Sequence, residues 1–504
     1  MRQPLDRTLR ATRLTPNRHG AAQWAVNSRV LLVVVASVLF AAVAAGFAFA
    51  LDVSSDEGFY AQAAFRAASG LVAYRDFGYS QGPVVPYVNG AAMAFAGFGL
   101  LPQRLLGAAQ GVLQMAVLML LAVRLGDLLA GSVAAALLLL SPHWVENLTL
   151  GNTYALGGLF VALAALAFAG IEAPRPRLAV TLACGVLAAG CRLSLAPFGA
   201  ILAFALVAGR VRDERLAFAG LAAALGAGYT LAVFGPFLLA DREATLFWLV
   251  RFHLASVIRR RGAPSLEEAF VLAPAAALLA AAVLALWRRS RAADVRAGAA
   301  RALFAAALAT AAANLLVRAP YGGYVTPVTG VLAVAGARLL LGALPERRSV
   351  AAAAAVLLAA AGALVFRPAL RPSALDDVAR AAAFLRAHTE SSARVACTLP
   401  EVALEAGRDV LPGLEMGKFG FTEEMPPEEA ARLHLAHASV LEEALRARTV
   451  GAVVLSQSRN WNFGWSAPSL KPTSGETLAR LRAAFDAGWR VAYADPSVLV
   501  LLPR

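Results

Sequence analysis

Residues 54–70, SSDEGFYAQAAFRAASG, follow directly after the first long apolar run of the chain and carry two adjacent carboxylates, Asp56 and Glu57. A serine three residues before Glu57 is the pattern of a capping box, and Asp56 falls in the first turn, where a carboxylate suits the helix dipole. Gly70 can end the helix that this pattern predicts over 55–69. The two acidic residues have either this structural role or a chemical one.

Composition places the chain in a membrane. Of its 504 residues, 59% are hydrophobic and 15% are charged, and the mean hydropathy is +0.64. A soluble domain is usually about half apolar and about a quarter charged. The length allows a large membrane domain and one further domain.

The net charge of +14 comes almost entirely from arginine, since Lys418 and Lys471 are the only lysines. The arginines cluster in short segments between apolar runs, as topology determinants do. This distribution argues against nucleic acid as a partner. The three cysteines, Cys184, Cys191 and Cys397, form no CxxC pair or disulfide framework, so redox chemistry is not predicted.

A helix needs about 20 apolar residues to cross a bilayer core of about 30 Å. Eleven runs qualify or nearly qualify: 30–50, 104–123, 131–148, 154–171, 178–191, 194–208, 216–239, 268–287, 301–317, 324–341 and 349–366. Residues 1–29 lead into the first run without a clear cleavage site. They therefore read as a cytoplasmic tail before a retained membrane helix, and 30–366 as the transmembrane domain.

Arginine placement predicts the orientation. With a cytoplasmic N-terminus, the inner segments include EAPRPR, GRVRDER, WRRSRAADVRAGAAR and PERR, whereas the outer segments 142–153 and 319–323 carry no Arg or Lys. This is the positive-inside pattern. It puts a long first outer loop at 51–103 and leaves the C-terminal residues outside.

The second long outer loop, 240–267, breaks this pattern because Arg259, Arg260 and Arg261 fall on the outer side. Three explanations stay open. The segment dips back into the membrane, the count of spans is off by one, or an anion binds there.

The pattern of helical and strand-like runs in residues 373–504 predicts a small extracytoplasmic α/β domain. A helix with Ser373 as N-cap begins it, ARVACTL and VGAVVLS have the length of strands, and the last residues read as two strands around a turn at Asp495-Pro496. A second helix is predicted over 426–448. This domain contains no phosphate loop, metal-ligand spacing or nucleophile elbow.

The acidic pair belongs to a longer pattern within residues 56–104. Behind it come the aromatic pair Phe59-Tyr60, a Gly70-to-Asp76 stretch, the turn Gly82-Pro83 and Arg104 at the opening of the next apolar run. This order resembles glycosyltransferases that use polyprenyl-phosphate sugars. It is similar to the dolichyl-phosphate-mannose protein mannosyltransferase superfamily (glycosyltransferase family 39), which includes the lipid A aminoarabinose transferases.

The resemblance implies a GT-C fold of about 11 transmembrane helices with a small outer α/β domain. It also implies a catalytic site at Asp56 and Glu57, with Asp56 as general base and Glu57 as its neighbour or as ligand of a divalent cation. Arginine matches phosphate oxygens bidentately, so the candidates for the donor phosphate are Arg192, Arg259, Arg260 and Arg261. The candidates for the substrate pocket are Tyr60, Arg104, Asn152, His253, Tyr321 and Tyr324.

Three positions depart from the family pattern. The Gly70-to-Asp76 stretch has one extra residue, Gln81 stands where some relatives have lysine, and Asn152 stands where the family often has a second acid. Asn152 therefore puts a two-acid or metal-dependent scheme in doubt. Each candidate also has a structural alternative: a short external turn for Arg192, a headgroup-facing cluster for the three arginines, and an interfacial aromatic belt for the tyrosines.

The predicted function is transfer of a sugar from a polyprenyl-phosphate donor at the outer side of a bacterial inner membrane, with inversion. The acceptor stays open between protein, lipid and glycan. Two other classes remain as alternatives, a non-catalytic scaffold with the same fold and a transporter or lipid flippase. Few ionisable residues lie deep inside the predicted spans, which disfavours ion coupling.

Overall fold

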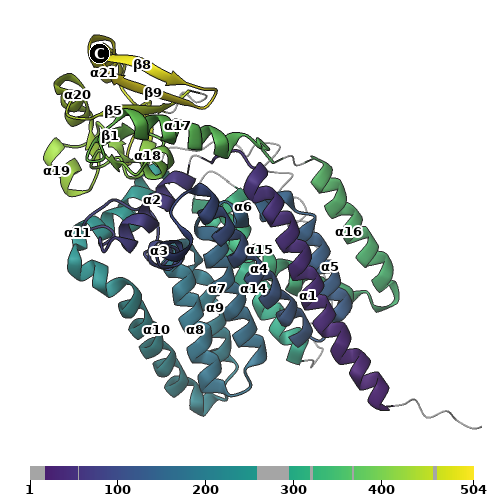
Figure 1. Cartoon of the computed structure of the whole chain (residues 1–504). Helices are drawn as coiled ribbons and strands as arrows, with labels where there is room; N and C mark the ends of the chain where they lie inside the picture. The colour runs from purple at the N-terminus through teal and green to yellow at the C-terminus, as the bar shows by residue number, and fades with distance from the viewer. Residues whose placement is uncertain (1–17, 55, 258–294, 318–321, 366–367, 458–461) are drawn as a thin grey trace, which may run out of the picture.

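A helical membrane domain carries an α/β domain at one end (Figure 1). The computed structural model describes residues 18–54, 56–257, 295–317, 322–365, 368–457 and 462–504. The predicted run 268–287 lies outside the described residues, as do Arg259, Arg260, Arg261 and Tyr321.

Within the described residues, seven helices are long and apolar enough to cross a membrane. They are α1 (Arg18–Ala50, with its apolar part at 27–50), α4 (Leu100–Arg124), α7 (Thr153–Gly170), α10 (Arg212–Ala240), α14 (Val295–Val317), α15 (Thr326–Ala343) and α16 (Arg348–Val365). The chain is therefore a multi-pass membrane protein, as its composition predicts.

The apolar run 131–148 is not one straight helix, contrary to the prediction. It forms α5 (Leu128–Leu139) and α6 (Pro142–Thr149), which are bent by 72° at the break between them. Ser141 caps α6 by accepting from the Trp144 N–H, and Pro142 disfavours helical geometry at the residue before it. If this bent pair is one span, the described residues contain up to eight.

The shorter runs 178–191 and 194–208 correspond to α8 (Pro174–Cys191) and α9 (Ala196–Ala208), joined by the 3₁₀ turn η1 (Leu193–Leu195). These two helices approach closely at glycine. A Cβ on Gly185 would lie 2.8 Å from the Cα of Gly199. Small residues at such crossings let membrane helices pack backbone to backbone.

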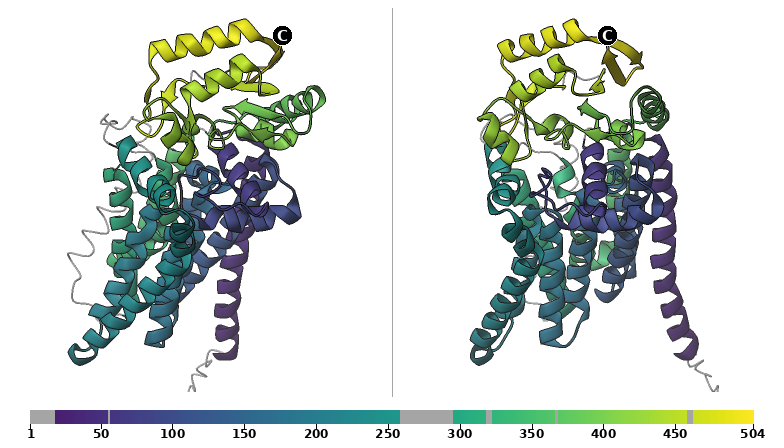
Figure 2. Two further views of the ribbon diagram at one scale, coloured as in Figure 1. Left: turned by 90° about the vertical axis from the view of Figure 1, so that its left-hand side faces the viewer. Right: turned by 60° about the vertical axis from the view of Figure 1, so that its left-hand side comes forward.

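Two short helices of the segment 51–103, which the sequence predicts as the first outer loop, lie at the end of the bundle below the α/β domain (Figures 1 and 2). The helix predicted over 55–69 is confirmed as α2 (Glu57–Ala68), and Gly70 after it has a φ of +86°. The second is α3 (Val84–Ala96). The local pattern thus predicts the bounds of α2 to within two residues.

The α/β domain contains a five-stranded sheet in the order β2-β1-β5-β9-β8. Its strands are β1 (Arg394–Cys397), β2 (Asp409–Val410), β5 (Ala452–Ser456), β8 (Trp489–Ala494) and β9 (Val498–Pro503). Strand β1 is parallel to both neighbours, and β9 is antiparallel to both. Helices α17 (Ala374–His388), α18 (Pro400–Ala406), α20 (Ala438–Ala447) and α21 (Gly475–Gly488) accompany the sheet. The predicted strands and the terminal hairpin are confirmed.

The prediction of one helix over 426–448 is wrong. The segment forms α19 (Pro427–Arg432), then strand β4 (Ala436–His437), then α20. His434 has a φ of +56°, which ends the helix, and β4 pairs in parallel with β3 (Phe421–Thr422). Pairing with a distant strand has overridden the local helical pattern.

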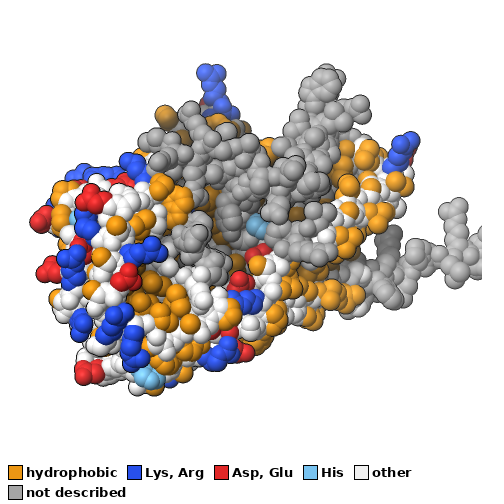
Figure 3. Space-filling view, turned by 90° about the horizontal axis from the view of Figure 1, so that it is seen from above, with side chains coloured by type: hydrophobic (Ala, Val, Ile, Leu, Met, Phe, Trp, Pro, Cys, Tyr) orange, Lys and Arg blue, Asp and Glu red, His pale blue; other side chains and the backbone are white. Residues whose placement is uncertain are grey.

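The α/β domain is joined to the first outer loop by backbone pairing at the end of α1. Asp52 N–H donates to the Ala369 carbonyl at 2.7 Å, and Arg371 N–H donates to the Ala50 carbonyl at 2.7 Å. Seen from the α/β end, charged side chains cover that domain while apolar side chains line the helices (Figure 3). This division suits a domain in water on a bundle in lipid.

Candidate active site

A buried arginine clamp fixes the start of α2. The Arg104 side chain is 0% exposed and binds both carboxylate oxygens of Glu57, with Nε 2.6 Å from Oε2 and Nη2 2.9 Å from Oε1. Its remaining N–H groups donate to the carbonyls of Ala48, Leu51 and Asp52. All five donors of the guanidinium are thus used. The clamp ties the last carbonyls of α1 to the first residue of α2.

This geometry gives the contacts of two predicted site residues, whose roles in a site stay predictions. Arg104 was expected to line the substrate pocket, but it is completely buried and has no N–H group left for a ligand. Glu57 was expected beside the base or on a divalent cation. Its carboxylate is instead neutralised by Arg104 and also accepts from the Ser54 N–H at 2.7 Å. Both residues position the loop.

Asp56 occupies the N-cap of α2, yet its side chain makes no capping hydrogen bond. The arm of the capping box that forms is the one from Ser54 N–H to Glu57. Asp56 is half-buried. Of the two acidic residues, Glu57 is therefore the one whose carboxylate makes the capping hydrogen bond at the start of α2.

Tyr60 lies one helical turn after Asp56, within electrostatic range of both Asp56 and Arg192. Burial first, and the charge of Asp56 second, raise the pKa of the Tyr60 phenol, while the charge of Arg192 lowers it. The phenol therefore stays protonated at neutral pH and can donate a hydrogen bond rather than act as a base. Its ring packs in an aromatic cluster with Phe59 and Tyr79, whose ring centroids lie 4.2 Å and 6.3 Å away.

Arg192 lies at the break between α8 and η1 and is 6% exposed. Its guanidinium carbon is 4.4 Å from the centroid of the Tyr324 ring and 5.2 Å from that of Tyr154. Its Nε donates to the Ser194 hydroxyl at 3.3 Å. Among the residues that the structure describes, Arg192 forms no ion pair. A buried cation without a carboxylate partner is costly, which marks a place for an anionic ligand.

The other predicted pocket residues have defined structural positions. Asn152 is the N-cap of α7, where its side chain accepts from the Tyr154 N–H at 2.8 Å. His253 lies in α12 (Phe252–Val257), and its Nε2 pairs with the Ser80 carbonyl. Tyr154, whose backbone N–H binds Asn152, also packs its ring against Arg192. Tyr324, in η3 (Gly322–Val325), contacts Arg192 directly.

The α/β domain contributes residues that the sequence did not indicate. Glu401 of α18 is 3% exposed and lies against Gly58 of α2, so close that a Cβ on Gly58 would be 1.9 Å from the Glu401 Oε2. Gly58 is two residues after Asp56. The motif 56–104 contains this glycine, but nothing in its local pattern indicates a partner more than 300 residues away.

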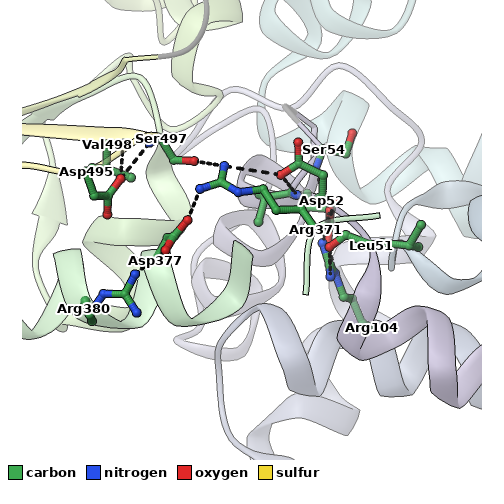
Figure 4. Close-up of polar contacts among 12 residues, drawn as sticks. Leu51, Asp52, Ser54, Arg104, Arg371, Asp377, Arg380, Asp495, Ser497 and Val498 are labelled. Carbon is green, nitrogen blue, oxygen red and sulfur yellow. Dashed lines mark hydrogen bonds and ion pairs between the residues drawn. The ribbon is translucent and has the colours of Figure 1, made fainter. Parts of the chain in front are cut away.

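Arg371 forms the other junction between the domains (Figure 4). Its guanidinium lies 3.9 Å from the Asp52 carboxylate and also contacts Asp377 and Ser497 of the α/β domain. A cleft next to it is lined by residues of the first outer loop, among them Ser54, and by residues of the α/β domain. In the described part of the chain, no group of three His, Cys, Asp or Glu residues could hold a metal ion.

Solved structures resemble the chain over nearly its whole length. The crystal structure of ArnT from Cupriavidus metallidurans bound to undecaprenyl phosphate aligns with a TM-score of 0.65 at 16% identity, over 94% of this chain and 97% of that one. Apo ArnT from the same organism gives 0.62 at 15% identity, over 96% and 98%. The chain has the GT-C fold. At such identities the likeness establishes the fold alone.

The GT-C fold is also shared with a mycobacterial arabinofuranosyltransferase AftD, a mutant of which aligns with a TM-score of 0.50 at 16% identity, over 94% of this chain and 41% of that one. Neither a protein-family model nor a curated protein matches the chain. The predicted fold is confirmed.

Proposed function

We propose that the chain is a membrane glycosyltransferase that moves a sugar from a polyprenyl phosphate to an acceptor nucleophile. The observation that carries the proposal is the arrangement around Tyr60, whose phenol is influenced by the charge of Asp56 on one side and by the charge of the buried Arg192 guanidinium on the other. The similarity to ArnT bound to undecaprenyl phosphate supports the donor class.

In this proposal Asp56 accepts the proton that the acceptor loses as it attacks the anomeric carbon. The bond from that carbon to the phosphate oxygen breaks, and its electron pair leaves with the polyprenyl phosphate. Arg192 stabilises the charge that develops on the phosphate. One displacement without a covalent intermediate inverts the anomeric centre. Glu57 and Arg104 act as positioning residues.

The proposed orientation follows from the charge of the connecting segments. Arginine-rich segments lie at the end of the bundle away from the α/β domain, so this end is cytoplasmic and the α/β domain extracytoplasmic in a bacterial inner membrane. Arg259, Arg260, Arg261, Tyr321 and His253 remain candidate donor or pocket residues. The acceptor is a protein, lipid or glycan reached through the cleft beneath the α/β domain.

The deciding experiment uses the full-length protein in nanodiscs with a panel of radiolabelled polyprenyl-phosphate sugars, following loss of label from the lipid. We expect turnover of one donor by the wild type and a rate ~10²–10⁴-fold lower for Asp56→Asn. Asp76→Asn is the matched control, because it removes a part-exposed carboxylate, paired with the exposed Arg75, from the same loop, and an amide oxygen can still accept from the Val72 N–H.

Full activity of Asp56→Asn would reject the assignment of the base and leave the fold intact. Absence of turnover and of donor binding across the whole panel would instead reject sugar transfer. It would favour the non-catalytic scaffold, in which the acidic pair serves only to build the loop.

A further inference from the structure

Helix α3 is apolar but too short to cross a membrane. It has 13 residues, so at 1.5 Å per residue it is roughly 20 Å long, whereas a bilayer core is about 30 Å thick. It lies at the end of the bundle below the α/β domain and runs across the membrane helices rather than along them (Figure 1). An apolar helix of this length is typical either of a buried core or of the surface layer of a bilayer.

The polar side chains of α3 face the protein. Asn89 is 2% exposed, and its Oδ1 accepts from the Nε2 of Gln110 in α4 at 2.9 Å. The phenol oxygen of Tyr87 accepts from the Ala73 N–H at 3.1 Å. Asn89 and Tyr87 are the only polar side chains in the sequence of α3, which contains no charged residue. The helix therefore uses its polar groups on the side that packs against the rest of the chain.

The outward side of α3 is apolar. Phe95 is 94% exposed, and Val88, about two turns earlier on the same side, is 41% exposed. The other exposed residues of the helix are Ala91, Ala94 and Ala96. A helix between a protein core and water has the reverse pattern, with its polar side chains outside. The exposure of Phe95 excludes a buried core, so the outward side of α3 matches a lipid environment.

An apolar groove lies between α3 and the first turns of α4. Its volume is about 240 Å³, and it is lined by Ala92, Met93, Ala96, Leu101, Pro102, Leu105 and Leu106. Leu105 is 43% exposed, and Leu113, about two turns further along α4, is 56% exposed. Because α4 is long and apolar enough to cross the membrane, these leucines mark its lipid-facing side. The groove is thus continuous with the lipid-facing surface of the bundle.

We propose that α3 lies within the lipid leaflet on the α/β side and that this groove holds an acyl chain of a bilayer lipid. None of the lining side chains carries an N–H or O–H group, so the groove offers no donor to a head group or to a sugar. An acyl chain needs only apolar contact and is supplied by the bilayer around α4.

This contact would set the depth of the candidate active site in the membrane. Helix α3 packs closely on α2, since a Cβ on Gly90 would lie 2.5 Å from the Ala64 carbonyl oxygen. Helix α2 has Asp56 at its N-cap. A lipid-embedded α3 therefore holds α2 and Asp56 at a fixed height above the hydrocarbon core. The proposal does not depend on the reaction at Asp56.

The position of α3 is tested by spin labelling of the full-length protein in nanodiscs, on a Cys184→Ala background because the other two cysteines are buried. A nitroxide on Phe95→Cys should collide often with oxygen, which concentrates in lipid, and rarely with a water-soluble nickel chelate. The label on Leu113→Cys should behave in the same way. Val491→Cys, at a residue that is 59% exposed in the α/β domain, should give the opposite result. A label at position 95 that behaves like the one at position 491 would overturn the proposal.

Occupancy of the groove is tested with phosphatidylcholine that carries a photoactivatable diazirine in one acyl chain. After irradiation, peptide mass spectrometry should find adducts within residues 92–106. Ala92→Phe should lower their yield by at least about fivefold, because the added ring takes the space of the chain. The matched control is Ala91→Phe, since Ala91 is exposed on the same helix but does not line the groove. This control should give the wild-type yield.

Equal yields from Ala92→Phe and Ala91→Phe would show that the adducts come from general lipid contact, which would overturn the groove assignment. A polyprenyl phosphate with the same diazirine is the competitor. If it labels residues 92–106 in preference to the phosphatidylcholine, the groove belongs to the donor chain and the choice of a bilayer lipid is wrong. If Ala92→Phe does not fold, absence of adducts within 92–106 of the wild type refutes the proposal by itself.

Discussion

Arg104 holds Glu57 in a bidentate ion pair in which the two side chains are 0% and 1% exposed. The same guanidinium binds the carbonyl of Ala48 in the last turn of α1 and those of Leu51 and Asp52 just after it. Arg104 therefore fixes the end of the first membrane helix relative to the start of α2. Asp56 lies between these two points, so the contacts of Arg104 set its position.

Removing the arginine of this clamp should destabilise the protein. Burial raises the pKa of Glu57 even beside Arg104, and Arg104→Leu would leave that carboxyl buried without a positive partner, with only the Ser54 N–H donating to it. We expect a loss of about 3–5 kcal/mol at pH 8, because breaking a buried pair leaves one charge uncompensated. The unfolded state releases the Glu57 proton at lower pH than the folded state does, so the loss of stability should be smaller at pH 5 than at pH 8.

Thermal unfolding in detergent at the two pH values measures this loss of stability. Glu57→Gln/Arg104→Leu should be more stable than Arg104→Leu at pH 8. A loss that is the same at both pH values would contradict this account.

Arg192 should behave in the opposite way. It has no ion-pair partner among the described residues, so Arg192→Gln strands no buried carboxylate. We expect the melting temperature to be unchanged or higher, while binding of polyprenyl phosphate weakens by at least about tenfold, as for a lost charged hydrogen bond of about 1.5–3 kcal/mol.

Quenching of tryptophan fluorescence by added polyprenyl phosphate measures this affinity. Arg177→Gln is the control, because Arg177 lies in the first turns of α8, at the opposite end of that helix, and donates to the Ile171 carbonyl. Unchanged affinity in Arg192→Gln would mean that the phosphate binds elsewhere.

Gly58 should be intolerant of any side chain. A Cβ there would lie 1.9 Å from the Glu401 Oε2 and 2.9 Å from its backbone nitrogen, so Gly58→Ala must push α18 away from α2. We expect a lower melting temperature and reduced sugar transfer, with kcat affected more than the donor KM. Glu401→Ala added to Gly58→Ala should restore part of both. Gly46→Ala, inside α1, controls for the gain in helix propensity because a Cβ there meets nothing within 4 Å. A Gly58→Ala variant with wild-type activity would show that the seating of α18 does not matter for the site.

Cys397 should resist alkylation in the folded protein. It is buried in β1, its Sγ donates to the Leu399 carbonyl at 2.9 Å, and burial raises the pKa of its thiol well above the ordinary value. Because the thiolate is the reactive form, iodoacetamide at pH 8 should leave Cys397 unmodified until the α/β domain unfolds in denaturant. Peptide mass spectrometry before and after unfolding checks this, and labelling of the native protein would show that β1 opens.

Several features follow from the sequence because their causes are local. Hydropathy alone gives a multi-pass membrane protein, since each apolar run must bury its own backbone hydrogen bonds in a helix. The helix α2 follows from a serine, an acid and a glycine within 17 residues, 54–70. The terminal hairpin of β8 and β9 follows from alternating apolar residues around a turn.

The tertiary structure decided which side chains become partners of the site residues, because these partners come from other segments of the chain. The tyrosines around Arg192 come from α7 and η3, the arginine that neutralises Glu57 comes from α4, and the glutamate against Gly58 comes from α18. The same holds for β4, whose pairing with β3 broke a helix that its own residues favoured. A local pattern predicts how a segment folds, because propensity and capping act within one turn. A local pattern does not predict which distant segment will neutralise a buried charge. In this fold Arg104 neutralises Glu57, Glu57 accepts from the Ser54 N–H, and the side chain of Asp56 makes no capping hydrogen bond.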